Sequence, residues 1–142
     1  MLTYLSLGSN LGEREQVLNR AIELLQTRVG NVVRRSSFFY STSWGYTSEH
    51  EFCNLCVAVD TPLSPLDLLH ATQAIERELG KTTHTTKTYL NNIEQSAIYH
   101  DRAIDIDILT YEDITLQTPE LTLPHPHMSE RDFVLIPLRE IQ

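Results

Sequence analysis

The feature that most constrains the fold is the stretch RAIDIDIL at 102–109, in which polar and apolar residues alternate. A period of two predicts a half-buried strand over 102–110, because successive side chains of a strand point to opposite faces. The isoleucines would face a core, and Asp105 and Asp107 would share the other face. Adjacent ionised carboxylates repel, so they require a counter-charge, and oxygen ligands suit magnesium. A plain strand with a solvated acidic face is the simpler alternative.

The other periodic segments predict an α+β, ferredoxin-like fold. Apolar and β-branched runs predict strands over 2–7, 32–41 and 52–61, with a short strand near 114–116. Stripes with a period of 3.6 predict helices over 13–29 and from Ser64-Pro65 to Gly80. The order β-α-β-β-α-β gives two split β-α-β units, with both helices on one face of a mainly antiparallel sheet and a short C-terminal addition. Residues 81–101 lack an apolar period and are expected to form a long loop.

Composition and charge narrow the class of protein. The chain has 142 residues, so residues 1–142 are expected to form a single domain, which we expect to be a monomer. A net charge of −8 without a basic block argues against a nucleic-acid or anionic-membrane surface. No apolar run approaches membrane-span length and no signal peptide opens the chain, so we expect a cytoplasmic protein. Cys53 and Cys56 lie in a strand-like run and are expected to be reduced core thiols rather than a metal or redox pair.

Side chains at the predicted strand ends form further candidate clusters. Cations that could bind phosphate oxygens are Lys81, Arg102, His125 and Arg131. Phe52 and Phe133 could form a platform for a flat ligand, or could plug the core. Gly8-Ser9-Asn10 joins a strand to a helix, where backbone N–H groups could meet an anion, but the lysine and spacing of a P-loop are absent.

Several motifs occur together in a fixed order. They are Gly8-Ser9-Asn10-Leu11-Gly12, Phe39-Tyr40-Ser41-Thr42, Phe52-x-Asn54, Gln73-x-x-Glu76, Arg102-x-x-Asp105-x-Asp107, and Leu123-Pro124-His125 followed by Arg131-Asp132-Phe133. This combination resembles the 6-hydroxymethyl-7,8-dihydropterin pyrophosphokinases, enzymes of folate biosynthesis. The resemblance implies a ferredoxin-like core. It also implies transfer of the diphosphate of ATP to the hydroxymethyl oxygen of the pterin, with release of AMP.

The resemblance further implies a role for each matching residue. Asp105 and Asp107 would hold two Mg²⁺ ions, and Arg102 would act with them in catalysis. MgATP would contact Gln73, Glu76, Lys81, Lys87, Tyr99, Arg102, Ile108, Thr122, His125 and Arg131. The hydroxymethyldihydropterin would contact Thr42, Ser43, Trp44, Phe52, Asn54, Asp105 and Phe133, with the two phenylalanines stacked on its ring.

The chain departs from the family pattern in the loop at 81–101. This loop is longer than usual and poorer in cations, with Lys81 and Lys87 before Arg102, and Tyr99 stands near the place of a family tryptophan. Pro126 follows His125, where a tyrosine can occur. Two other functions stay open: a catalytically silent module that binds a small ligand or another chain, and a different D-x-D enzyme such as a nucleotide-sugar transferase.

Overall fold

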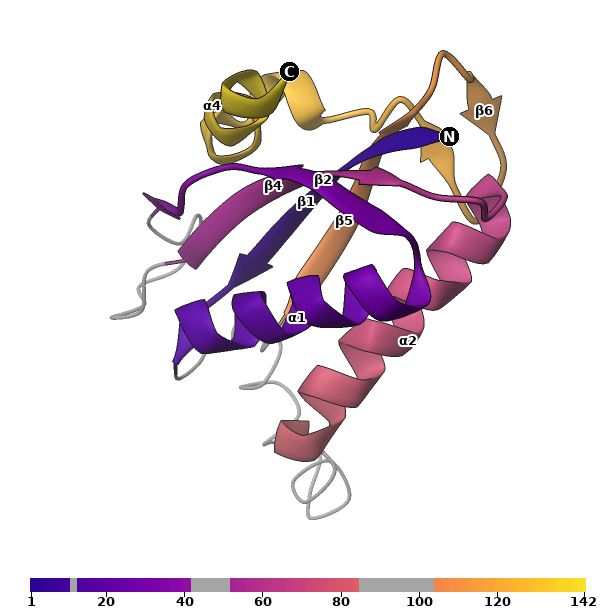
Figure 1. Cartoon of the computed structure of the whole chain (residues 1–142). Helices are drawn as coiled ribbons and strands as arrows, with labels where there is room; N and C mark the ends of the chain where they lie inside the picture. Colours follow the sequence, from indigo (N-terminus) through magenta and orange to yellow (C-terminus); the bar gives the residue numbers. More distant parts are fainter. Residues whose placement is uncertain (11–12, 42–51, 85–103) are drawn as a thin grey trace.

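The computed structural model describes residues 1–10, 13–41, 52–84 and 104–142, with only the backbone described at 81–84. Three layers are visible in Figure 1. The helices α1 (Arg14–Arg28) and α2 (Pro65–His84) lie on one face of a sheet, and α4 (Asp132–Ile141) lies on the other. Among the described residues, no helix is both long and apolar enough to cross a membrane.

The sheet is antiparallel at every pairing within the described residues. Its strands, in spatial order, are β2 (Asn31–Arg35), β4 (Phe52–Asp60), β1 (Leu2–Ser9) and β5 (Asp105–Tyr111), and the short β3 (Phe39–Ser41) also pairs with β4. This strand order, with α1 and α2 as the two crossing helices, is the ferredoxin-like arrangement. The sequence prediction of the fold class is therefore confirmed.

The main core lies between the sheet and the two crossing helices. α1 contributes Leu18 and Leu25 and α2 contributes Leu68 and Ile75, all fully buried. α2 begins where the sequence predicted, because the Ser64 hydroxyl accepts a hydrogen bond from the Asp67 N–H at 3.2 Å and caps the first turn. The core fixes which face of each strand points toward the helices.

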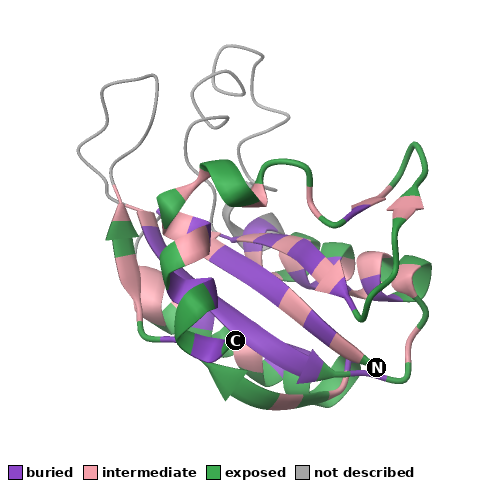
Figure 2. Ribbon diagram, turned by 90° about the horizontal axis from the view of Figure 1, so that it is seen from above, coloured by how far each residue is buried: buried purple, intermediate pink, exposed green. Residues whose placement is uncertain are grey.

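A second core on the opposite face was not predicted. Val134, Leu138 and Ile141 of α4 pack against Cys56 and Ala58 of β4 and against Leu109 of β5. The central strands are consequently buried on both sides (Figure 2), which explains the unbroken apolar run of β4. The expectation that both predicted helices lie on one face is confirmed for α1 and α2, and the C-terminal addition forms the unpredicted helix α4 on the other face. Both cysteines are free and buried, as predicted.

Several element boundaries also differ from the prediction. The expected strand over 32–41 is divided into β2 and β3, because Ser36 leaves the regular ladder and its hydroxyl accepts a hydrogen bond from the Cys56 N–H at 2.9 Å. α2 continues past Gly80 to His84, so Gly80 does not close it. The short strand near 114–116 is β6 (Leu116–Gln117), which pairs with β7 (Thr122–Leu123), and a 3₁₀ turn at Met128–Glu130 precedes α4.

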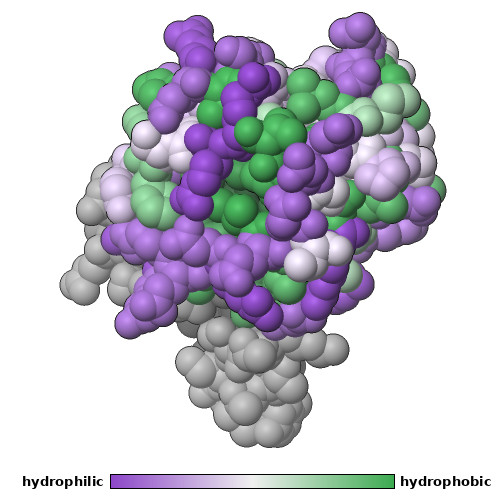
Figure 3. All heavy atoms as spheres, in the orientation of Figure 1, coloured by the Kyte–Doolittle hydropathy of each residue, from purple (hydrophilic) through white to green (hydrophobic). Residues whose placement is uncertain are grey.

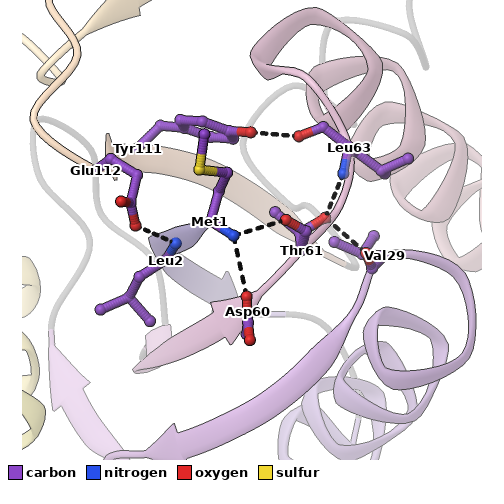
Figure 4. A network of polar contacts seen from close by, with 8 residues as sticks. All are labelled: Met1, Leu2, Val29, Asp60, Thr61, Leu63, Tyr111 and Glu112. Atoms are coloured by element: carbon purple, nitrogen blue, oxygen red, sulfur yellow. Dashed lines mark hydrogen bonds and ion pairs between the residues drawn. The ribbon is translucent and has the colours of Figure 1, made fainter.

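A network of hydrogen bonds joins the strands and loops at one end of the sheet (Figure 4). The buried Thr61 hydroxyl donates to the Val29 carbonyl at 2.6 Å and accepts from the Leu63 N–H at 3.1 Å. The Met1 ammonium donates to the Thr61 carbonyl at 3.0 Å, and the Tyr111 hydroxyl donates to the Leu63 carbonyl. The start of β1 and the ends of β4 and β5 are joined here, which leaves the other end of these strands for the candidate site.

Side chains along the outer edge of β2 disfavour pairing with another strand. The Val32 N–H donates to the Gln26 side-chain oxygen at 2.9 Å, and Arg34 and Arg35 are exposed. A shallow groove runs between α1 and β2, and Figure 3 shows apolar side chains among polar ones on this face. The hydrogen bond at Val32 and the two arginines make this edge less suited to pairing with a strand of another chain.

Candidate active site

The floor of the candidate site is a row of residues across four strands. Phe39 lies opposite Asn54, Asn54 opposite Gly8, and Gly8 opposite Asp105. Residues directly opposite each other in a sheet share a face, and here it is the face that α4 covers further along β4. Gly8 has no side chain, so β1 projects no side chain on this face between Asn54 and Asp105, and we call the space over Gly8 the slot. A Cβ atom on Gly8 would lie 2.9 Å from the Asn54 Oδ1.

The aspartate pair lies beside this slot. Ile104, Ile106 and Ile108 are buried in the main core, so Asp105 and Asp107 are on the opposite face, where both are half-buried. The alternation predicted from the sequence is therefore confirmed up to Ile108. Leu109 continues the alternation on the α4 face, and the register shift against β1 that follows it turns Tyr111 into the main core.

Glu76 of α2 holds the peptide group between the two aspartates. Its Oε2 accepts a hydrogen bond from the Ile106 N–H at 2.8 Å. Among the described strands, β5 lies at the edge of the sheet, and the carboxylate accepts the hydrogen bond that a neighbouring strand would otherwise accept. Burial raises the pKa of Glu76 to about 7, with Asp105 and Asp107 raising it further and the Ile106 hydrogen bond opposing them. The site thus concentrates negative charge, which a cation would offset.

Asp105 and Asp107 are the described residues best suited to hold a divalent cation. Carboxylate oxygens from one strand face match the ligands that magnesium prefers. No group of three or more His, Cys, Asp or Glu side chains in the described ranges is arranged to hold a metal ion. A metal bound here would therefore take part of its coordination from a substrate or water, as magnesium commonly does with nucleotide phosphates.

His125 and Arg131 lie on the same side of the site. The His125 N–H donates to the Leu109 carbonyl at 2.8 Å, which fixes the segment beside β5. Burial lowers the pKa of His125, as do the nearby charges of Arg131 and His127, whereas Asp105 acts in the opposite direction. The His125 Nδ1 accepts from the His127 N–H at 3.1 Å, so the neutral ring carries its proton on Nε2. Nε2 can then donate to a phosphate oxygen.

The two predicted aromatic residues are both half-buried. Phe52 is on β4, two residues before Asn54 and on the same face. Phe133 is in the first turn of α4 and packs against the edge of the second core, with the Arg131 guanidinium 5.7 Å from its ring centre. Their role in stacking on a ligand stays a prediction.

The expected nucleotide residues fall around the edge at β5. Gln73 is exposed on α2 one turn before Glu76, and Thr122 is half-buried on β7. The Ile108 side chain is buried in the main core, so only its backbone is available to a ligand. Several predicted residues lie outside the described residues: Thr42, Ser43, Trp44, Lys87, Tyr99 and Arg102. Lys81 is described only as helix backbone.

Gly8 and Ser41 belong to motifs identified in the sequence, but neither was predicted to act where the structure places it. Gly8 forms the slot, and Ser41 binds the Asn54 side chain through its hydroxyl at 2.9 Å. Both depend on strand register, which brings residues from three separate segments together. A short Phe-Tyr-Ser run does not by itself indicate such a contact.

The sequence comparisons identify related proteins. The family model described as 7,8-dihydro-6-hydroxymethylpterin-pyrophosphokinase (HPPK) matches residues 4–142. A Porphyromonas gingivalis protein named 2-amino-4-hydroxy-6-hydroxymethyldihydropteridine pyrophosphokinase is 49% identical over 141 residues, covering 99% of this chain and 90% of the relative. A Bacillus subtilis protein of the same name is 38% identical over 141 residues, covering 99% of this chain and 77% of that protein.

Solved structures show the same fold at lower sequence identity. A triple mutant of Plasmodium falciparum HPPK-DHPS with STZ-DHP superposes with a TM-score of 0.73 at 16% identity. An HPPK-DHPS in complex with substrates gives a TM-score of 0.69 at 14% identity. This chain is covered over 99% in both cases but spans only 39% and 40% of those chains. At such identities the likeness shows the fold alone.

Proposed function

This chain belongs to the 7,8-dihydro-6-hydroxymethylpterin-pyrophosphokinase family, and we propose that it transfers diphosphate from ATP to the hydroxymethyl oxygen of 6-hydroxymethyl-7,8-dihydropterin, releasing AMP. The reaction belongs to folate biosynthesis. The observation that carries the proposal is the placement of Asp105 and Asp107 on one strand face beside the slot over Gly8. That arrangement provides a place for a flat ligand next to a place for metal-bound phosphate.

Asp105 and Asp107 would hold the metal, which we propose to be two Mg²⁺ ions. Bound there, the ions would supply positive charge to the phosphates and orient the attacking oxygen for in-line transfer. Glu76 holds the Ile106 peptide between the aspartates and so fixes the backbone from which both side chains project. His125 would donate from Nε2 to a phosphate oxygen, and Arg131 would bind a phosphate through its guanidinium.

The pterin would lie over Gly8. Phe52 and Phe133 would stack on its two sides, and Asn54 would bind its polar edge. The remaining assignments rest on the family resemblance: Thr42, Ser43 and Trp44 for the pterin, Arg102 for catalysis and phosphate, and Gln73, Glu76, Lys81, Lys87, Tyr99, Ile108 and Thr122 for the nucleotide. We further propose that residues 1–142 form one domain and that the protein acts as a cytoplasmic monomer that binds neither nucleic acid nor membranes.

An assay for AMP release separates this function from its competitors. With magnesium and ATP, the protein should release AMP only when the hydroxymethyl pterin is present, because the pterin is the diphosphate acceptor. A silent binding module would release none with or without the pterin. A different D-x-D transferase would leave the pterin unchanged. Either of these results would refute the proposed function.

A further inference from the structure

The Asn54 side chain is held in one orientation by its neighbours. It is only 3% exposed. Its Nδ2 donates one hydrogen bond to the Phe39 carbonyl at 3.1 Å and another to the Ser41 hydroxyl at 2.9 Å. A main-chain carbonyl can only accept, so the contact with Phe39 identifies the nitrogen end of the amide. Both hydrogens on that nitrogen are therefore in use.

The oxygen end of the amide points the other way, toward Gly8. The Asn54 Oδ1 is the atom that a Cβ on Gly8 would approach to 2.9 Å. Within the described part of the chain, no group donates a hydrogen bond to this oxygen. Among the described side chains only the Ser9 hydroxyl is a fully buried polar group without a partner, so the Asn54 Oδ1 is an acceptor that still has access to solvent. A ligand with an N–H group in the slot could replace that solvent as its donor.

We propose that Ser41 is a positioning residue: it orients the Asn54 amide so that only the amide oxygen faces the slot over Gly8. The slot then selects a ligand whose edge donates hydrogen bonds. The inference rests on the proposed function, in which the slot holds the pterin. The aminopyrimidinone ring of a pterin carries such an edge, with its 2-amino group and ring N–H. A ligand that presents carbonyl oxygens at the same place would meet the Asn54 oxygen and be disfavoured.

Of the two groups that accept hydrogen bonds from the Asn54 Nδ2, the Ser41 hydroxyl is the one that a substitution can remove. The Phe39 carbonyl belongs to the backbone of β3, whose pairing with β4 does not depend on side chains. Removing the Ser41 hydroxyl would leave one Nδ2 hydrogen buried without an acceptor. The Phe39 carbonyl would then hold the amide alone, so its oxygen would be oriented toward the slot less firmly. The protein should then discriminate less between ligands that donate a hydrogen bond to Asn54 and ligands that accept one.

Calorimetry on three variants tests this role. Binding of 6-hydroxymethylpterin is measured with magnesium and a non-hydrolysable ATP analogue at saturation, alongside its lumazine counterpart, which has a carbonyl oxygen in place of the 2-amino group. Ser41→Ala should weaken pterin binding about three- to tenfold, the range expected for one hydrogen bond, and should narrow the preference for pterin over lumazine. Ser41→Thr keeps the hydroxyl and should restore both. ATP-analogue affinity should stay unchanged.

Ser37→Ala is the matched control. It removes a serine hydroxyl four residues away, one that donates to the Glu140 carboxylate at 2.6 Å and lies outside the site. Pterin affinity and preference should match the wild type in this variant. Unchanged pterin binding in Ser41→Ala, an unchanged lumazine preference, or an equal loss in Ser37→Ala would overturn the positioning role.

A ligand-free measurement keeps this inference separable from the proposed function. In the NMR spectrum of the free protein, the two Asn54 side-chain amide hydrogens should exchange slowly, and Ser41→Ala should make one of them exchange faster. If the wild type binds no pterin at all, the proposed function fails, and the amide spectrum still decides whether Ser41 orients Asn54. Identical amide exchange in both proteins would refute it.

Discussion

Replacing Asp105 or Asp107 with asparagine removes a negative charge without touching the buried Ile106 between them. Each variant should keep the melting temperature of the wild type. Each should lose turnover by roughly 100-fold or more, because a metal ligand contributes several kcal/mol of transition-state stabilisation. Steady-state kinetics at limiting magnesium checks the loss, and Asp113→Asn, an exposed acid in the turn after β5, serves as the control. Near-normal turnover in either site variant would remove the metal assignment.

Glu76 makes the stability of the metal-free protein depend on pH. Its folded-state pKa of about 7 lies above its ordinary value of 4.5, so the protonated form is favoured on folding. This contribution is fully present below pH 4.5 and is lost as the pH rises through 7. Glu76→Gln removes the titration but keeps an oxygen for the Ile106 N–H. Relative to the wild type, this variant should therefore gain stability as the pH rises.

The gain should be on the order of 3 kcal/mol, since each unit of pKa difference corresponds to about 1.4 kcal/mol. Urea unfolding in a chelator at pH 4.5, 6 and 8 measures it. If the difference in free energy of unfolding between the wild type and Glu76→Gln stayed constant from pH 4.5 to 8, Glu76 would not be held in an unfavourable charged state.

At the scale of single residues, the sequence predicts the aspartate pair well and the slot poorly. Alternation over 102–109 is a local property, so it assigns Asp105 and Asp107 to one face without knowledge of the partner strands. The contact between Ser41 and Asn54 depends on the pairing of β3 with β4. No periodicity within either strand specifies that register.

At the scale of elements, α4 carries the second core. Leu138 is 2% exposed against Cys56 and Ala58, whereas Ile136 of the same helix is 47% exposed. Leu138→Ala should lower the free energy of unfolding by about 2–5 kcal/mol, because it opens a cavity between α4 and the sheet. Ile136→Ala should change it by about 0.5 kcal/mol or less. Denaturant unfolding of both variants is the measurement, and equal small losses would mean that α4 contributes little to the fold.

α4 also shows why one element escaped prediction. Its buried residues Val134, Leu138 and Ile141 have helical spacing, but Pro137 lies among them. Proline inside a helix normally argues against one, because it lacks the N–H for the intrahelical hydrogen bond. Pro137 is tolerated six residues into this helix, where packing against the sheet compensates. The helices α1 and α2 carry long apolar stripes, and α2 also has a cap at Ser64, so the sequence places them within a few residues.

In the whole molecule, the two ends of the sheet have different roles: one end holds the strands together, and the other carries the candidate site. The end around Met1, Thr61 and Tyr111 is fastened by hydrogen bonds between strands and loops. The end around Gly8 and Asp105 gathers carboxylates, cations and aromatic side chains from α2, β4, β5 and α4. The ferredoxin-like strand order can be predicted because it follows from the order of the helices and strands along the chain. The three-layer arrangement is not, because it depends on where α4 docks.

The most direct test is a crystal structure of the protein with magnesium, a non-hydrolysable ATP analogue and 6-hydroxymethylpterin. The pterin ring should lie over Gly8 between Phe52 and Phe133, with an N–H group on the Asn54 Oδ1. Magnesium should lie on Asp105 and Asp107, next to the phosphates. A pterin bound elsewhere, or metal and phosphates away from both aspartates, would refute the proposed site.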